Sequence, residues 1–249
     1  PCALPISMMY ALFITVFSLG PLLAILGESL SIRTTAHGPG TWGITNYLSL
    51  LSRGGFLVSI LNTLLLGLGS AALASITGFT LTLGLRRTGS PFMSKVLPLL
   101  PLAVSSVVLA YGWSTALGSA SVFALAAVQA VAAYPFALRA IQSSVGVSDN
   151  RYAEAARTLG SSRLGATLKV RLPIAAPALG SGFALAFAMS AGDANALIAA
   201  PVSGFETLSL YLYRLAGAYR FDEACAAAVI LAVLTGFVFF LKDARDGLA

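Results

Sequence analysis

The chain has 249 residues, of which 57% are hydrophobic and only 10% are charged, and its mean hydropathy is +0.88. Soluble domains carry about 25% charged residues, so this composition argues against a soluble enzyme and against a disordered chain. The net charge of +6 is interpreted against a membrane rather than against nucleic acid, and the class that fits is an all-α protein with several membrane spans.

Six apolar stretches approach the roughly 20 residues that a bilayer-spanning helix needs. They predict spans over residues 4–26, 56–85, 96–117, 120–138, 174–200 and 224–241, within a single membrane domain that covers residues 1–249. Pro98 and Pro101 lie near the start of the third stretch. Small residues recur in the second and fifth stretches, at Gly67, Gly69, Gly180 and Gly182, and this pattern predicts close helix packing.

The basic residues indicate an orientation. With the N-terminus in the cytoplasm, the inner segments hold eleven of the 15 basic residues: Arg86, Arg87, Lys95, Arg139, Arg151, Arg157, Arg163, Lys169, Arg171, Lys242 and Arg245. The outer segments hold the other four: Arg33, Arg53, Arg214 and Arg220. Because positive charge is enriched on cytoplasmic loops, we expect both termini and the loop over residues 139–173 to be cytoplasmic.

This loop carries an ordered pattern. From Asp149 to Pro173 the sequence predicts two short helices, over 151–159 and 164–168, joined by a bend at Gly160. Two interpretations stay open on these residues alone. The helix pair is either a docking surface for a soluble partner or a connecting segment that lies on lipid headgroups.

The same segment resembles the signature loop of binding-protein-dependent ABC importer permeases, E-A-A-x3-G-x9-I-x-L-P. The matching residues are Glu154, Ala155, Ala156, Gly160, Leu172 and Pro173, and Val170 stands in place of the isoleucine. In that family the loop is the coupling helix that sits in a groove of the ATP-binding subunit. The resemblance implies the six-helix type I importer permease fold in the bacterial cytoplasmic (inner) membrane.

The resemblance also implies partners. These are an ABC ATPase dimer, an extracytoplasmic substrate-binding protein, a second permease half and membrane lipid, and no nucleic acid. The chain has no GxxxxGK[ST] motif, so ATP and Mg are expected on the partner ATPase, with no cofactor on this chain. It also lacks HExxH and a Ser/His/Asp set, and it has one histidine, so we expect no catalytic residues and no metal site.

Short stretches of the C-terminal part resemble thiamine and iron(III) permeases. They are Ser190–Asp193, Phe205–Leu208 and Tyr211–Tyr213, although Ala194-Asn195 departs from the thiamine type. A chain that opens at Pro1 with one signature loop fits the second half of a fused permease. We therefore expect a thiamine permease, with iron(III) second and sulfate, molybdate or polyamine still open. A channel or a secondary transporter is the rival class.

Asp193 is the one formally charged residue well inside a predicted span. Charge inside a membrane is costly, so such residues often face a pathway. One interpretation puts Asp193 and Asn195 on the translocation path, where the carboxylate would attract a cation. The alternative is a helix cap or a partner of Asn195 or Arg220.

Overall fold

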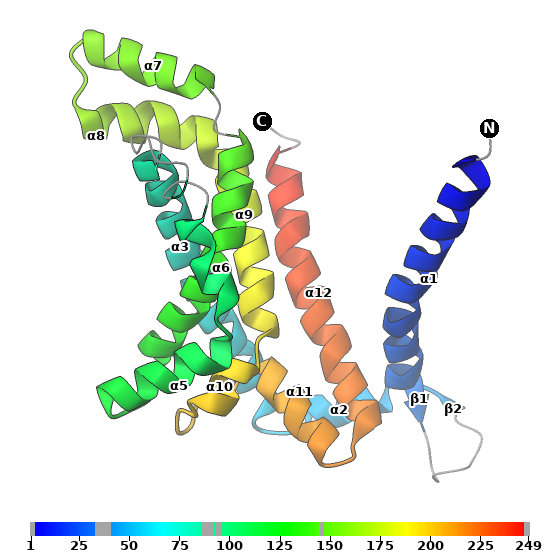
Figure 1. The fold of residues 1–249 in the computed structure, drawn as a ribbon. Coiled ribbons are helices and arrows are strands. Elements are labelled where there is room, and N and C mark those ends of the chain that lie inside the picture. The colour runs from blue at the N-terminus through cyan, green and yellow to red at the C-terminus, as the bar shows by residue number, and fades with distance from the viewer. Residues whose placement is uncertain (1–2, 33–40, 86–91, 93–95, 145–146, 247–249) are drawn as a thin grey trace.

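The computed structural model describes residues 3–32, 41–85, 92, 96–144 and 147–246 (Figure 1). The elements in chain order are α1 (Ala3–Leu30), β1 (Ser31–Ile32), β2 (Thr41–Trp42), α2 (Thr45–Leu51), α3 (Phe56–Leu85), η1 (Leu97–Ala103), α5 (Ser106–Leu117), α6 (Val122–Ser144), α7 (Val147–Thr158), α8 (Arg163–Ala166), η2 (Thr167–Arg171), α9 (Leu172–Gly192), α10 (Asn195–Ala199), α11 (Leu208–Gly217) and α12 (Phe221–Asp246). The protein is all-α apart from one antiparallel pair of two-residue strands.

Five helical segments within the described ranges are long and apolar enough to cross a membrane. They are Met8–Leu30, Phe56–Leu85, Val122–Gln142, Arg163–Gly192 and Phe221–Ala244. These segments overlap the first, second, fourth, fifth and sixth predicted spans. The fourth continues to the end of α6 at Ser144, so the predicted loop over 139–173 begins inside a helix.

The third predicted span, over 96–117, is instead two short pieces. The 3-10 helix η1 is followed by extended backbone at Val104, and α5 begins after Ser105, whose side chain accepts a hydrogen bond from the Val107 amide. Pro98 and Pro101 explain the break, because a proline lacks the amide hydrogen that an α-helix needs. The 12 residues of α5 extend only about 18 Å, less than the roughly 30 Å hydrocarbon core.

The fifth predicted span, over 174–200, is also broken near its end. Helix α9 ends at Gly192, and Asp193 has extended backbone with φ of −84° and ψ of 102°. The short helix α10 holds most of the remaining residues. Asp193 therefore lies in a turn between two helices and not in the middle of one.

The centre of the bundle consists of α3, α6 and α9, which pack against one another in all three pairs. Two glycines make this packing close. A Cβ added at Gly78 of α3 would lie 3.0 Å from the Leu138 backbone nitrogen, and one at Gly182 of α9 would lie 3.1 Å from the Ala137 Cα. The α6 backbone at Ala137 and Leu138 is thus held between two glycines.

Figure 1 shows α12 beside this centre and α1 at the edge of the molecule, in contact with α12 and α2. Helix α11 packs against α12 and α3, and its apolar residues Leu208, Leu210 and Leu215 are buried in the protein. The hairpin of α7 and α8 lies at one end of the bundle, together with the start of α1 and the end of α12. Helices α2, α5, α10 and α11 lie at the opposite end.

Candidate functional site

Helix α7 ends at a glycine in the left-handed region. Gly160 has a φ of +90°. Its amide donates to the Arg157 carbonyl at 3.0 Å, and the Ser161 amide donates to the Ala156 carbonyl at 3.0 Å. This pair of bonds is a Schellman motif, which satisfies carbonyls that a helix end leaves free. The bend predicted at Gly160 is present, and Ala156 supplies one of its two acceptors.

The chain then turns into α8. Ser162 is the N-cap, because its side chain accepts a hydrogen bond from the Gly165 amide at 3.0 Å. Helical backbone continues from Arg163 to Gly192, but it bends: α8 and η2 lie alongside α7 across the end of the bundle, whereas α9 runs along the bundle (Figure 1). The second predicted helix of the loop is thus present as α8 and η2, and it leads directly into the fifth span. The π-helical segment η2 ends at Arg171, two residues before Pro173, which lies in the first turn of α9, where a proline is tolerated.

The α7–α8 hairpin buries small residues and exposes larger ones. Ala153 on α7 and Ala166 on α8 are each 2% exposed, whereas Leu159 is 88% exposed and Leu164 is 75% exposed. Glu154 is also exposed. The hairpin lies beyond the end of the bundle (Figure 1), and it therefore exposes a carboxylate and these two apolar side chains there. Exposed apolar groups outside a span are typical of a docking surface.

The remaining residues of the signature lie close to this surface. Ala155 is exposed and Ala156 is half-buried. Leu172 and Pro173 are exposed at the start of α9. The structure thus places the motif from Glu154 to Gly160 on the outer arm of the hairpin and the Leu-Pro pair at its base.

Asp193 and Asn195 line one cavity, which lies toward the end of α9 that is farther from the hairpin. The cavity is an open hollow with a volume of about 480 Å³, and it is lined by the end of η1, the η1–α5 linker, the start of α5, α6, the end of α9 and the turn from α9 to α10. Asp193 Oδ1 accepts a hydrogen bond from the Asn195 amide at 2.9 Å. Asp193 therefore lines the cavity and accepts a hydrogen bond from the first amide of α10, as the alternative with Asn195 predicted, and its role on the translocation path stays a prediction.

Gln129 on α6 lines the same cavity and was not singled out from the sequence. It is 2% exposed, and its side-chain oxygen accepts hydrogen bonds from the hydroxyls of Ser70 and Ser190. Its side-chain nitrogen donates to the Asp193 carbonyl at 3.5 Å. Gln129 therefore joins α3, α6 and α9 beside the cavity. The signal in the sequence is that Gln129 is the one side-chain amide in the mostly apolar run over 120–138.

The charge of this cavity is negative. Asp193 is acidic, and the described residues that line the cavity include no lysine, arginine or histidine. No ion pair joins Asp193 to a residue in the described ranges; Arg220 pairs with Glu223 instead. Two unit charges about 4 Å apart interact by roughly 4 kcal/mol at an effective dielectric constant of about 20, so this cavity favours a cation and disfavours an anion.

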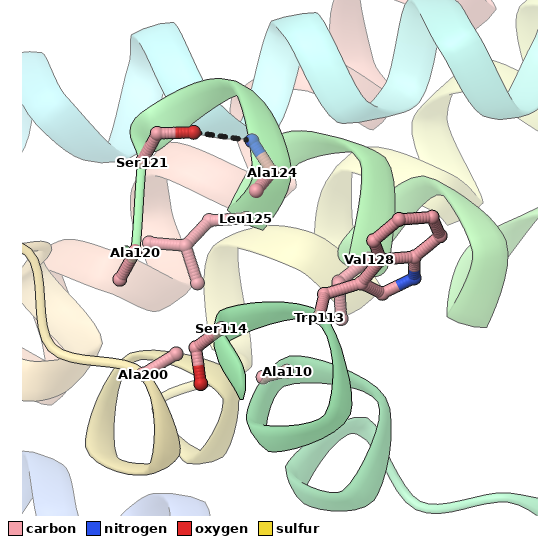
Figure 2. Close-up of a pocket in the computed structure, with 9 residues that line it drawn as sticks. All are labelled: Ala110, Trp113, Ser114, Ala120, Ser121, Ala124, Leu125, Val128 and Ala200. Atoms are coloured by element: carbon pink, nitrogen blue, oxygen red, sulfur yellow. Dashed lines mark hydrogen bonds between the residues drawn. The ribbon is translucent and has the colours of Figure 1, made fainter. Parts of the chain in front are cut away.

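Two further hollows are weaker candidates. The first lies between α5, α6 and Ala200 (Figure 2), and its volume of about 10 Å³ is room for one water at most. The second has a volume of about 430 Å³, and its two charged residues, Arg214 and Glu206, pair with each other at 3.0 Å. The first is a packing gap with an apolar lining, and the second carries no net charge.

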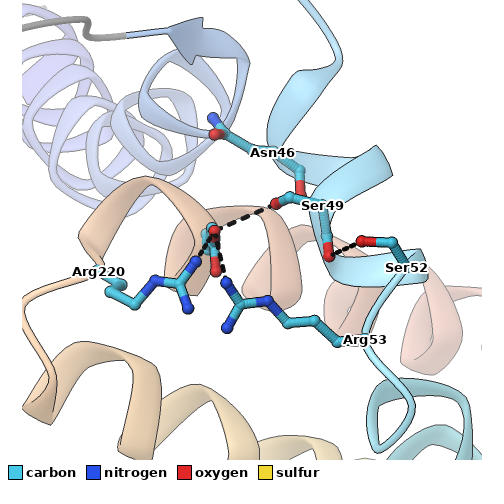
Figure 3. Close-up of polar contacts among 6 residues, drawn as sticks. Asn46, Ser49, Ser52, Arg53 and Arg220 are labelled. Carbon is cyan, nitrogen blue, oxygen red and sulfur yellow. Dashed lines mark hydrogen bonds and ion pairs between the residues drawn. The ribbon is translucent and has the colours of Figure 1, made fainter.

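A separate polar cluster ties the far end of the bundle together. Glu223 at the start of α12 accepts from the Ser49 hydroxyl at 3.2 Å and pairs with Arg53 at 3.4 Å and with Arg220. Figure 3 shows Ser49, Arg53 and Arg220 converging on one carboxylate. The Glu223 side chain on α12 is 12% exposed, and its partner Ser49 lies on α2. We therefore interpret the cluster as a link that stabilises the contact between α2 and α12.

The comparison with family models finds no match. Among curated proteins, the chain is 29% identical over 224 residues to the spermidine/putrescine transport system permease protein PotC of Escherichia coli K12, covering 82% of this chain and 81% of the relative. It is 33% identical over 118 residues to the sulfate transport system permease protein CysT of Salmonella typhimurium LT2, covering 47% of this chain and 43% of the relative.

Among solved structures, the fold matches a bacterial ABC transporter involved in the import of the acidic polysaccharide alginate. The TM-score is 0.72 at 16% identity, with 98% of this chain and 94% of that chain covered. A second structure, of an alginate ABC transporter in complex with a pentasaccharide-bound periplasmic protein, matches with a TM-score of 0.66 at 16% identity, covering 96% and 92%.

The substrates named for these relatives are polyamines and sulfate, so the thiamine or iron(III) specificity stays a prediction. The relatives are transport permeases and not enzymes. This chain has the helical fold found in a bacterial ABC importer, and its curated relatives are permease proteins of transport systems.

Proposed function

We propose that this chain is the transmembrane permease subunit of an ATP-driven importer in a bacterial cytoplasmic membrane. The observation that carries the proposal is the α7–α8 hairpin. Its Glu154–Gly160 arm matches the family signature residue by residue, ends in a Schellman motif and projects from a fold shared with an importer permease. An ABC ATPase dimer docks on this hairpin and supplies the ATP and Mg.

The proposed orientation puts the hairpin in the cytoplasm. The start of α1 and the end of α12 lie at the same end of the bundle as the hairpin. The basic residues favour this end as the inner side by eleven to four, although Arg33, Arg86, Arg87 and Lys95 lie outside the described residues. The cavity beside Asp193 then lies toward the outer side, where an extracytoplasmic binding protein delivers the solute.

The continuous helix from Arg163 to Gly192 supports a route for coupling. Its 30 residues comprise α8 and η2 across the end of the bundle and α9 along it (Figure 1), and they join the hairpin directly to Ser190 and Asp193 at the cavity. When the ATPase dimer closes, displacement of the hairpin moves this helix against α6. Access to the cavity thereby alternates between the two sides of the membrane. The protein has two conformations, and ligands on each side shift the equilibrium between them.

A second permease half completes the proposed pathway. Residues of α1 such as Met8, Phe13 and Phe17 are more than 60% exposed, and the cavity near Asp193 is an open hollow. The second half packs against this chain, either fused to it or separate, and lipid covers the remaining apolar surface.

We propose thiamine as the solute, on the resemblance of the C-terminal stretches together with the negative cavity. Iron(III) is the second candidate, and the polyamines of the relative PotC are a third. Thiamine and polyamines are organic cations that suit a cavity with one carboxylate and an apolar wall. A hard metal ion prefers several oxygen ligands at once.

Uptake into proteoliposomes tests the proposal. The vesicles hold this chain with its second half, its ATPase and its binding protein, and labelled thiamine, spermidine and iron(III) are compared with and without ATP. ATP-dependent uptake of one solute is expected. Uptake that does not depend on ATP would favour the rival class, a channel or a secondary transporter.

A further inference from the structure

We infer that the α8–η2 arm of the hairpin lies on an anionic phospholipid surface, so that only the α7 arm is left for the ATPase. The inference goes beyond the proposed function and rests on it for the side of the membrane on which the hairpin lies. It starts from a stripe of three leucines. Leu164, Leu168 and Leu172 recur at every fourth residue, so they share one face of the helical arm, and they are 75%, 59% and 36% exposed.

This leucine stripe faces away from α7. Helix α7 packs against α8 and η2, and the buried residue of α8 is Ala166, so Ala166 faces α7. Ala166 is two residues from both Leu164 and Leu168, a rotation of roughly 200° on a helix with about 3.6 residues per turn. Figure 1 shows α7 farther from the bundle than α8. The stripe therefore faces the level at which the fifth span begins, where η2 continues directly into α9.

Basic residues flank the stripe. Arg163 directly precedes Leu164 and Lys169 directly follows Leu168, so each lies about 100° to one side of its leucine. Both basic residues are exposed, and neither forms an ion pair with an acidic residue in the described ranges. Residues 155–192 contain four basic residues and no acidic residue. An apolar stripe between basic side chains is typical of a helix in the membrane interface, where anionic headgroups attract the positive charge.

A lipid surface fits this face better than the ATPase does. Glu154 and the exposed Leu159 belong to the α7 arm, so the groups that suit a soluble partner lie on the arm that is farther from the bundle. The two interpretations of the loop thus apply to different arms: α7 docks on a protein, and α8–η2 lies on headgroups. Contact with lipid holds the base of the hairpin at the membrane surface, and displacement of α7 is then transmitted to α9.

Quenching by lipid tests the position of the arm. The full importer complex, with Cys2 and Cys225 replaced by serine, is placed in nanodiscs of phosphatidylglycerol and phosphatidylcholine, and Leu168→Cys carries a small fluorescent label. Leu159→Cys is the matched control, because it replaces an exposed leucine at the end of the α7 arm. A lipid nitroxide near the headgroup is expected to quench the Leu168→Cys label roughly threefold more strongly than the control. Equal quenching at the two positions would overturn the inference. Quenching of Leu168→Cys that appears only after removal of the ATPase would also overturn it, because the ATPase would then cover this arm.

A second comparison tests the charge of the lipid. The nitroxide is carried by either phosphatidylglycerol or phosphatidylcholine at the same mole fraction, and the anionic lipid is expected to quench Leu168→Cys about twofold more strongly. Arg163→Gln combined with Lys169→Gln is expected to remove this preference, whereas Arg157→Gln on the α7 arm is expected to leave it. Equal quenching by the two lipids before these substitutions, or a preference that survives the double substitution, would contradict an anionic-lipid surface. Neither measurement requires uptake, so a failure here is distinguishable from failure of the proposed function, which would appear as the absence of ATP-dependent uptake in the unmodified protein.

Discussion

Gly182 on α9 lies directly against Ala137 on α6. A Cβ built on Gly182 would be 3.1 Å from both the Ala137 Cα and its carbonyl oxygen. Because both of these are backbone atoms, they cannot move aside without moving α6 itself. The two helices that flank the cavity are therefore held together at a backbone-to-backbone contact, which is how small residues stabilise helix pairs in a membrane.

Gly182→Ala is expected to destabilise the protein by about 1–3 kcal/mol, the usual cost of overpacking a close contact. Thermal unfolding of the purified complex in detergent measures this effect. Gly69→Ala is the matched control, since it lies in α3 with nothing within 4 Å of its added Cβ. The control is expected to be neutral or slightly stabilising, because alanine favours a helix over glycine by about 1 kcal/mol. Equal effects of the two substitutions would contradict this account.

The sequence alone could not separate these two glycines. Gly67, Gly69, Gly180 and Gly182 all lie in small-residue stretches, yet the structure places Gly67 against Phe187 and Gly182 against the α6 backbone, with nothing near Gly69. Composition predicts that helices pack closely. It does not predict which side of a helix faces which neighbour, because that depends on the crossing of segments far apart in the chain.

The bend of the α7–α8 hairpin, in contrast to the helix packing, could be predicted from the sequence. The bend at Gly160 depends on local backbone preference, and it was predicted from Gly160 and the helix-forming residues before it. Pro98 and Pro101 are a local signal for the break in the third predicted span. The strongly apolar composition of the same run favours an unbroken span, and the sequence alone does not decide between the two. Gln129 could not be assigned to the site beforehand, because its partners Ser70 and Ser190 lie about 60 residues away on each side.

Substitutions at Gly160 are expected to follow the energy of the left-handed conformation. Gly160→Asn should retain most ATP-dependent uptake, because asparagine tolerates positive φ. Gly160→Val should lose most of it, since a left-handed conformation costs an ordinary residue about 1–2 kcal/mol and a β-branched residue more. Binding of the ATPase to the purified permease should fall in the same order. A Gly160→Val variant that binds the ATPase normally would show that the bend is not needed for docking.

Glu223→Gln is expected to destabilise the protein by about 1.5–3 kcal/mol, the range for hydrogen bonds to a charged group, because the Glu223 carboxylate is 12% exposed while its arginine partners are partly solvated. Both Arg53 and Arg220 would lose their charged acceptor. Asp243→Asn is the control, since its pair with Lys242 is solvent-exposed, with Asp243 at 73%, and such pairs contribute about 0–1 kcal/mol. Unfolding in detergent compares the two. If Glu223→Gln unfolded at the same temperature as Asp243→Asn, the cluster would not fasten α2 to α12.

Glu154→Arg is expected to uncouple ATP hydrolysis from transport while the chain still inserts and folds. Glu154 is exposed on α7, whereas the buried residue of this arm, among residues 151–160, is Ala153. Reversing its charge would therefore change the docking surface and not the helix. Asp243→Arg is the matched control, because it reverses a charge at the same end of the bundle but on α12.

Three measurements on Glu154→Arg decide its role. The amount of folded protein in the membrane should equal that of Asp243→Arg. Uptake driven by ATP should fall at least tenfold, and binding of the ATPase should weaken by a similar factor, since a reversed charge at a docked interface adds repulsion to the lost attraction. Normal uptake by Glu154→Arg would remove the hairpin from the coupling route, and the long helix from Arg163 to Gly192 would then transmit no motion from the ATPase to Asp193.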